Sequence, residues 1–170
     1  VVPGPVGIAL DEAAIGALEP DLAGRFRKAL FFREEAHLDP RRALSGLTAA
    51  LEEARMRFLF GDSKDKGAFD RIVDCTGAAR VGQLPELRGV RGEMLYLETE
   101  EINLSRPVRL LHPRHPIYIV PREKNRFMVG ATMIETDGDG PVTARSMMEL
   151  LNAAYALHPA FGEARVAETG

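Results

Sequence analysis

The sequence predicts an α+β fold, in which a mainly antiparallel sheet with helices on one side is joined to part of an α/β layer. Four strand-like segments follow one another between residues 93 and 134, separated by short turns rich in Pro, Gly, Asn and Arg. Before Leu84-Pro85, helical and strand-like segments alternate instead. We therefore expect an incomplete α/β layer in residues 1–85 and an antiparallel domain in residues 86–170, folded as one compact unit.

The first elements are short. The sequence predicts a short helix over residues 11–18 and a strand over residues 29–33. A longer helix is expected over residues 40–55, because Asp39 suits the N-cap and Pro40 the first helical position. Apolar residues follow at helical spacing and predict the buried face of this helix: Leu44, Leu47, Leu51 and Ala54.

Two short apolar runs and an exposed loop complete the predicted α/β layer. Residues 57–60 read as a strand and residues 61–67 as an exposed loop. Residues 71–75 predict a short buried strand that runs into Thr76-Gly77.

The antiparallel domain is expected to hold strands over residues 93–99, 108–112, 117–121 and 127–134. A helix is expected over residues 143–157, with four apolar residues along one side: Met147, Leu150, Leu151 and Ala154. His158-Pro159 should end it, and residues 165–169 predict a last strand.

Composition narrows the class of protein. The 170 residues are 45% hydrophobic and 28% charged, which is typical of a globular domain. A net charge of −3 disfavours nucleic acid as a partner, and no apolar run approaches the roughly 18 residues that span a bilayer. The start Val1-Val2-Pro3-Gly4-Pro5 is unlike a signal peptide. A single cysteine, Cys75, fits a reducing, cytoplasmic setting.

Familiar motifs are incomplete. No strand-to-helix G-x-G-x-x-G loop is present to cradle phosphates. His112 and His115 lie among prolines and read as turn histidines, and Asp137-Gly138-Asp139-Gly140 lacks the later Glu of a calcium loop, so no metal site is predicted. Cys75 reads as a small core residue rather than a nucleophile. The turn Thr76-Gly77 is more suggestive, because ligands bind at the carboxyl edge of doubly wound sheets.

Two stretches carry a resemblance to a known family. Residues 72–80, Ile-Val-Asp-Cys-Thr-Gly-Ala-Ala-Arg, are similar to the strand and turn beside the flavin in the D-amino-acid oxidase family of FAD enzymes. The pair Tyr118-Ile119-Val120-Pro121-Arg122 and Val129-Gly130-Ala131-Thr132-Met133 resembles the glycine oxidase branch, which serves thiamine biosynthesis. The similarity runs from about Leu18 to Gly170.

The resemblance implies FAD as cofactor and a small amino acid as substrate, oxidised to an imine or 2-oxo acid with formation of hydrogen peroxide. It implies that Tyr118 and Met133 line the substrate pocket and that Cys75, Thr76 and Gly77 lie beside FAD. From the residues alone, Tyr118 reads more readily as a core tyrosine with a satisfied hydroxyl, and Met133 reads as readily as a core side chain.

The family's glycine loop and its carboxylate-binding arginine have no counterpart in the sequence, so no catalytic residue is assigned. We expect a fragment that is inactive alone, with exposed apolar surface that favours a homo-oligomer. Alternatives are a fragment of a sarcosine or D-amino-acid oxidase, and a non-catalytic module for small-ligand binding or self-association.

Overall fold

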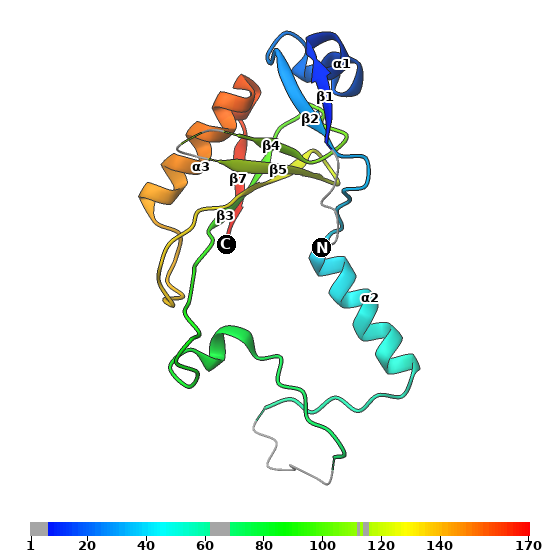
Figure 1. The fold of residues 1–170 in the computed structure, drawn as a ribbon, viewed down its shortest axis with the longest axis vertical. Helices are drawn as coiled ribbons and strands as arrows, with labels where there is room; N and C mark the ends of the chain where they lie inside the picture. The colour runs from blue at the N-terminus through cyan, green and yellow to red at the C-terminus, as the bar shows by residue number, and fades with distance from the viewer. Residues whose placement is uncertain (1–6, 62–68, 112, 114–115) are drawn as a thin grey trace.

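The computed structural model describes residues 7–61, 69–111, 113 and 116–170. Its centre is a five-stranded antiparallel sheet in the order β4-β5-β6-β3-β7 (Figure 1). The strands are β3 (Met94–Glu98), β4 (Val108–Leu110), β5 (Ile117–Arg122), β6 (Arg126–Gly130) and β7 (Arg165–Thr169). This sheet confirms the predicted fold class, although β4 and β6 end earlier than the sequence suggested.

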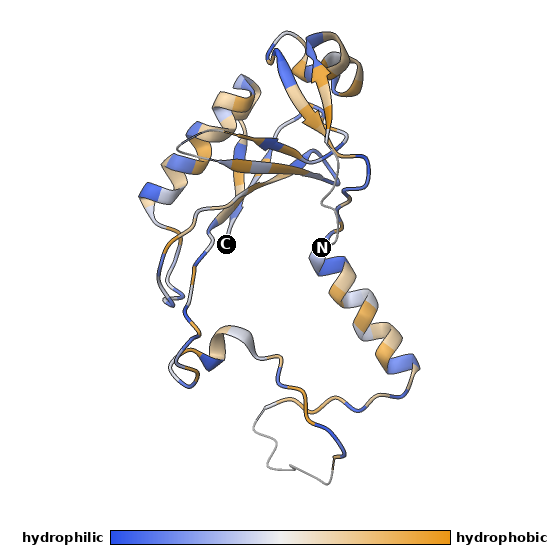
Figure 2. Ribbon diagram, viewed as in Figure 1, coloured by the Kyte–Doolittle hydropathy of each residue, from blue (hydrophilic) through white to orange (hydrophobic). Residues whose placement is uncertain are grey.

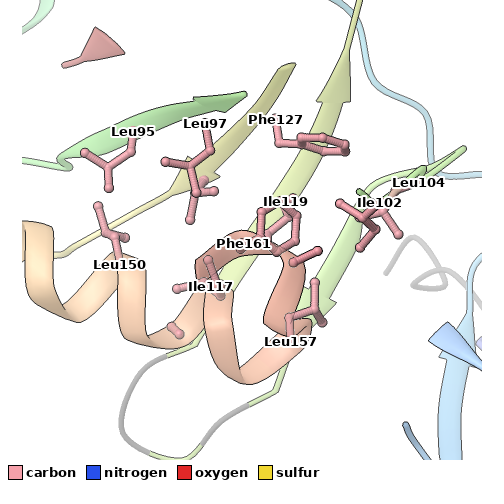
Figure 3. Packing of buried hydrophobic residues seen from close by; sticks show 14 of the residues in the cluster. Leu95, Leu97, Ile102, Leu104, Ile117, Ile119, Phe127, Leu150, Leu157 and Phe161 are labelled. Carbon is pink, nitrogen blue, oxygen red and sulfur yellow. The ribbon is translucent and has the colours of Figure 1, made fainter. Parts of the chain in front are cut away.

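Helix α3 (Ala144–Leu157) covers one face of this sheet, and the core lies between them (Figures 1 and 3). Thr143 caps the helix by accepting a hydrogen bond from the Ser146 backbone N–H at 3.2 Å. The ring of Phe127 in β6 packs edge to face against the ring of Phe161, with 5.3 Å between the ring centres. Phe161 lies in the short 3₁₀ turn Pro159–Gly162. The fully buried side chains at the centre of this core include Leu95, Leu97, Ile119, Val129, Leu150 and Leu157.

A small unit at the start of the chain adds to the same core. Strands β1 (Ile8–Asp11) and β2 (Lys28–Phe31) pair antiparallel, and α1 (Glu12–Leu18) and the 3₁₀ turn Pro20–Leu22 connect them. Ile15 and Leu22 belong to the main apolar cluster. The buried Glu19 carboxylate accepts hydrogen bonds from the Ser105 N–H at 3.0 Å and from Arg106 Nη1 at 2.9 Å. This unit is therefore fixed to the sheet.

Helix α2 (Pro40–Glu53) begins as the sequence predicted, because the Asp39 carboxylate accepts from the backbone N–H groups of Arg41 and Arg42. The predicted buried face is wrong: α2 has no buried residue, and Leu44 and Leu47 are 65% and 57% exposed. Beyond its first turn the helix stands away from the sheet and carries apolar residues that face no layer of the described chain (Figures 1 and 2).

The strands predicted over residues 57–60 and 71–75 are also absent from the described part of the chain. Ile72 and Val73 are 78% and 81% exposed, and Cys75 is exposed rather than a core residue. A strand exists only where another strand pairs with its backbone, and among the described residues no strand is paired with either segment.

We predict that the two classes of leucine differ sharply in their effect on folding. Leu97→Ala should lower the free energy of unfolding by about 2–5 kcal/mol, because it leaves a cavity in the core between the sheet and α3. Leu47→Ala on α2 should stay within about 0.5 kcal/mol of wild type. Urea unfolding of both variants measures the contrast, and equal losses would contradict this description of the core.

Candidate functional site

The face of the sheet opposite α3 carries the predicted substrate residue Tyr118. Its neighbours Ile117 and Ile119 point into the core, so Tyr118 points to the other side. In the register, Tyr118 pairs with Gly130 of β6. A Cβ placed on Gly130 would lie 2.9 Å from the Tyr118 hydroxyl oxygen and 3.0 Å from ring atom Cζ. The Tyr118 ring therefore lies directly against the backbone of β6, at a place where only glycine leaves room.

The next row on the same face holds Tyr96. The register aligns Val120 with Met128 and Met128 with Tyr96, which is 8% exposed. The guanidinium carbons of Arg41 and Arg126 lie 5.4 Å and 5.1 Å from the centre of the Tyr96 ring. Arg41 comes from the first turn of α2, so the start of that helix lies over this row.

Glu168 of β7 joins the two guanidinium groups. Its Oε2 accepts a hydrogen bond from Arg41 Nη1 at 3.0 Å and lies 3.6 Å from Arg126 Nη2. The Arg41 hydrogen bond holds the pKa of the Glu168 carboxyl below its ordinary value. We call Arg41, Tyr96, Arg126 and Glu168 the α2 clasp, because they hold the start of α2 on the sheet.

Two further contacts strengthen the same attachment. Arg42 pairs with Glu123 in the turn between β5 and β6. Arg122 Nη1 donates to the Leu38 carbonyl at 3.0 Å, which fixes the chain just before α2. Residues 38–42 therefore lie along one end of the face on which Tyr118 sits.

Met133, the second predicted substrate residue, comes shortly after β6 and is 86% exposed. Its neighbours hold the backbone: the Thr132 N–H donates to the Glu93 carbonyl at 3.1 Å, and Ile134 bridges to Arg91. The described chain therefore positions the backbone at Met133 firmly but leaves its side chain in solvent, whereas Tyr118 is partly buried.

Cys75, Thr76 and Gly77 lie on an exposed turn before the 3₁₀ turn Gly77–Arg80. Asp74 orders this turn by accepting hydrogen bonds from the Thr76 hydroxyl at 2.6 Å and from its backbone N–H at 3.0 Å. These bonds, together with Arg80, lower the pKa of the Asp74 carboxyl. Gly77 has a left-handed φ of +57°, and nothing lies within 4 Å of where a Cβ would be.

A hollow of about 310 Å³ lies beside this turn, lined by Asp74, Gly77, Arg80, Leu84 and Leu87. An open backbone at a glycine, next to polar groups and two leucines, suits the edge of a large planar cofactor. These residues fit one wall of an FAD site.

A second hollow of about 340 Å³ lies beside Arg91, the loop 138–142 and residues 169–170. Arg91 Nη2 lies 2.9 Å from Oε1 of Glu93, which is 1% exposed and accepts no hydrogen bond from a described residue at either carboxylate oxygen. The Arg91 guanidinium thus compensates a buried charge. Sequence reasoning missed this pair and the α2 clasp, because isolated Arg and Glu residues carry no sequence signal of their partners.

Metal and membrane features are not seen in the described ranges. Within residues 7–61, 69–111, 113 and 116–170, no three His, Cys, Asp or Glu side chains are grouped so that they could hold a metal ion. Over those same ranges, no helix has the length and apolar character required to cross a bilayer. His112 and His115, expected to be turn residues, lie outside the described residues.

Comparisons with known proteins add to this geometry. Residues 3–170 match the family model of FAD dependent oxidoreductases. The chain is 75% identical over 162 residues to ThiO of Rhizobium etli, an oxidoreductase named for thiamine biosynthesis; the match covers 95% of this chain and 50% of that protein. The chain thus spans about half the length of the curated relative it matches.

Solved structures show the same fold. Glycine oxidase from Geobacillus kaustophilus is similar with a TM-score of 0.74 and 23% identity, over 98% of this chain and 50% of that one. Iminodiacetate oxidase from Chelativorans sp. BNC1 is similar with a TM-score of 0.68 and 24% identity, over 96% of this chain and 50% of that one.

We predict that the α2 clasp opens at acid pH. Because Arg41 lowers the pKa of Glu168, the clasp contributes fully above the ordinary glutamate range and is lost as pH falls through the lowered pKa. The NMR signal of the Arg41 side-chain Nε–H should report this acid transition. Glu168→Gln should remove the transition, whereas Glu163→Gln, at an exposed position before β7, should keep it. A transition that persists in Glu168→Gln would disprove the assignment.

Proposed function

The chain belongs to the family of FAD-dependent oxidoreductases, and from this premise we propose that it forms half of an enzyme that oxidises the amine of glycine or another small amino acid. The identity to the Rhizobium etli relative carries this proposal and suggests thiamine biosynthesis as its setting. The predicted resemblance to the D-amino-acid oxidase family is confirmed by the match over residues 3–170.

We assign the substrate side to the sheet face that carries Tyr118. Its ring is held against Gly130, so the hydroxyl has a defined position from which to donate a hydrogen bond to a bound amino acid. Met133 would close the pocket from the segment after β6, where its exposed side chain is available to a ligand. The α2 clasp lies one row away on the same face and bounds the pocket at that end.

We assign the cofactor side to Cys75, Thr76 and Gly77 and to the hollow beside them. When bound, FAD would accept the two electrons of the Cα–H bond of the amino acid, whose C–N bond becomes C=N as the nitrogen loses a proton, and dioxygen would then take up the electrons and two protons as hydrogen peroxide. The part of this chain is to position: Gly77 leaves the backbone open to the cofactor, and Asp74 holds the turn.

Several finer points are part of the proposal. The proposed partner of the site is a small amino acid, and the proposed location is the cytoplasm. The division of the chain into residues 1–85 and 86–170 is likewise proposed. The turn at Cys75–Gly77 and the Tyr118 face fall on opposite sides of that division. A homo-oligomer stays a prediction.

Substrate profiling of the full-length protein that contains this chain tests the activity. We expect peroxide release with glycine to exceed that with sarcosine and with D-amino acids, since Tyr118 and Met133 would leave space for a small substrate. A clear preference for sarcosine or for a larger D-amino acid would assign the chain to one of the alternative oxidases instead.

We predict that the purified 170-residue chain is colourless after gel filtration and produces no peroxide from glycine, because it carries one wall of the cofactor site only. Thermal unfolding with glycine, glycolate or FAD should show no shift. A yellow eluate would refute this prediction, and a shift with one of the small ligands would favour a stand-alone binding module.

In the full-length enzyme, Tyr118→Phe should lower kcat/KM for glycine by roughly 10- to 100-fold, the loss expected for a hydrogen bond to a charged group. Tyr155→Phe is the matched control, because Tyr155 is exposed on α3, on the other face of the sheet. Equal activity of wild type and Tyr118→Phe would remove Tyr118 from the substrate site.

A further inference from the structure

Met94 lies on the same face of the sheet as Tyr118. Leu95 and Leu97 of β3 point into the core against α3 (Figure 3), so the alternation of the strand places Met94 on the opposite face. The register pairs Met94 with Gly130 of β6, and Gly130 with Tyr118 of β5. Tyr118, Gly130 and Met94 therefore form one row across three neighbouring strands.

Met94 has a glycine on both sides in this row. Gly130 is its neighbour on β6, and on the other side Gly170 exchanges two backbone hydrogen bonds with Met94, of 2.7 Å and 3.0 Å. A Cβ on Gly170 would lie 3.8 Å from Met94 Cγ, whereas the three atoms nearest to a Cβ on Gly130 all belong to Tyr118. The Tyr118 ring therefore leans over Gly130, and the Met94 side chain extends beside Gly170.

The apolar core does not use Met94. In the described part of the chain, this residue belongs neither to the buried cluster between the sheet and α3 nor to the partly buried side chains packed against that cluster. Its side chain is nevertheless only half-exposed to solvent at most, since it lies among its neighbours on the face of Tyr118. A methionine that served only to fill the core would contact that cluster.

The Tyr118 hydroxyl and the Met94 thioether offer different contacts to a ligand. The hydroxyl donates a hydrogen bond, and it lies over β6, because a Cβ on Gly130 would be 2.9 Å from its oxygen. Neighbouring strands are about 4.8 Å apart, so Met94 on β3 is the next side chain along the row from that hydroxyl. A ligand that accepts the Tyr118 hydrogen bond would therefore have the Met94 side chain, which is unbranched and adapts to irregular space, as its apolar neighbour.

We propose that Met94 is a specificity-determining residue, which limits the size of the substituent on the α-carbon of the amino acid. The inference rests on the proposed function, because it requires an amino acid that binds at the Tyr118 hydroxyl. With glycine bound, the Met94 thioether occupies the space that a substituent on the α-carbon needs. A larger amino acid must displace this side chain from its place beside Gly170, so the site selects glycine over its α-substituted analogues.

The test measures peroxide release by the full-length, FAD-loaded protein with glycine and with D-alanine, which adds one methyl group. Met94→Ala should raise the ratio of kcat/KM for D-alanine to kcat/KM for glycine by about tenfold, the discrimination that one methyl group permits in an apolar pocket. Met94→Leu, of similar volume, should keep this ratio within about twofold of wild type. Met94→Val, which is shorter and suits a strand, should shift the ratio in the same direction as Met94→Ala even if the alanine variant fails to fold.

Met128→Ala is the matched control. Met128 is a half-buried methionine on the same face, one row away, and its sulfur lies 3.9 Å from Arg122 Nη2. This variant should leave the substrate ratio within about twofold of wild type, even if it lowers stability. Titration of the flavin absorbance with glycolate and with D-lactate adds a readout without turnover. Met94→Ala should raise the affinity for D-lactate relative to glycolate by about tenfold, and Met128→Ala should not change it.

The possible failures can be told apart. If Met94→Ala or Met94→Val binds FAD but leaves both ratios unchanged, the inference is wrong, while oxidation of glycine by the unsubstituted protein still supports the proposed function. An equal shift in Met128→Ala would also overturn the inference, because the effect would then come from a general loosening of the sheet. An unsubstituted protein that releases no peroxide from any amino acid would overturn the proposed function, and this inference with it.

Discussion

The packing of α3 against one face of the five-stranded sheet determines how the rest of the molecule can be used. Leu95, Leu97 and Ile119 face the helix, and the strict alternation of a strand then assigns their neighbours to the opposite face. Tyr96 and Tyr118 therefore share a surface that the core does not need. One face of the sheet packs against α3, and the opposite face is available for other contacts. Ligand-binding side chains can be placed on this opposite face without reducing the volume of the core.

Charge, rather than apolar burial, connects that second face to α2. Arg41 and Arg126 lie over Tyr96 and share the carboxylate of Glu168. Contacts of this kind are directional and partly solvated, so they fix orientation more than they add stability. The arrangement suits a junction between the proposed cofactor side and the proposed substrate side, where relative position matters more than the strength of the attachment.

Sequence reasoning succeeded where the information is local or where the partner is inside the chain. The Asp39 cap and the hairpin that contains Tyr118 follow from capping chemistry and periodicity, with partners close in the sequence. The strand at residues 165–169 pairs with β3, which is distant in the sequence but lies within the chain. Sequence reasoning failed for residues 57–60 and 71–75, which read as strands but pair with no strand in the part of the chain that the structure describes. It could not find the pairing of Arg91 with Glu93, because the distance between charged side chains depends on strand geometry that composition does not encode.

The close approach of Tyr118 to Gly130 has a consequence for how such a pocket can change. The tyrosine rests on main chain, and main chain is common to every sequence that keeps glycine at that position. Substitutions elsewhere on β6 can therefore change the shape and polarity of the proposed substrate site while the Tyr118 ring stays in place. Changes in ligand preference would then fall on exposed side chains such as Met133, around a tyrosine whose position the backbone of β6 fixes.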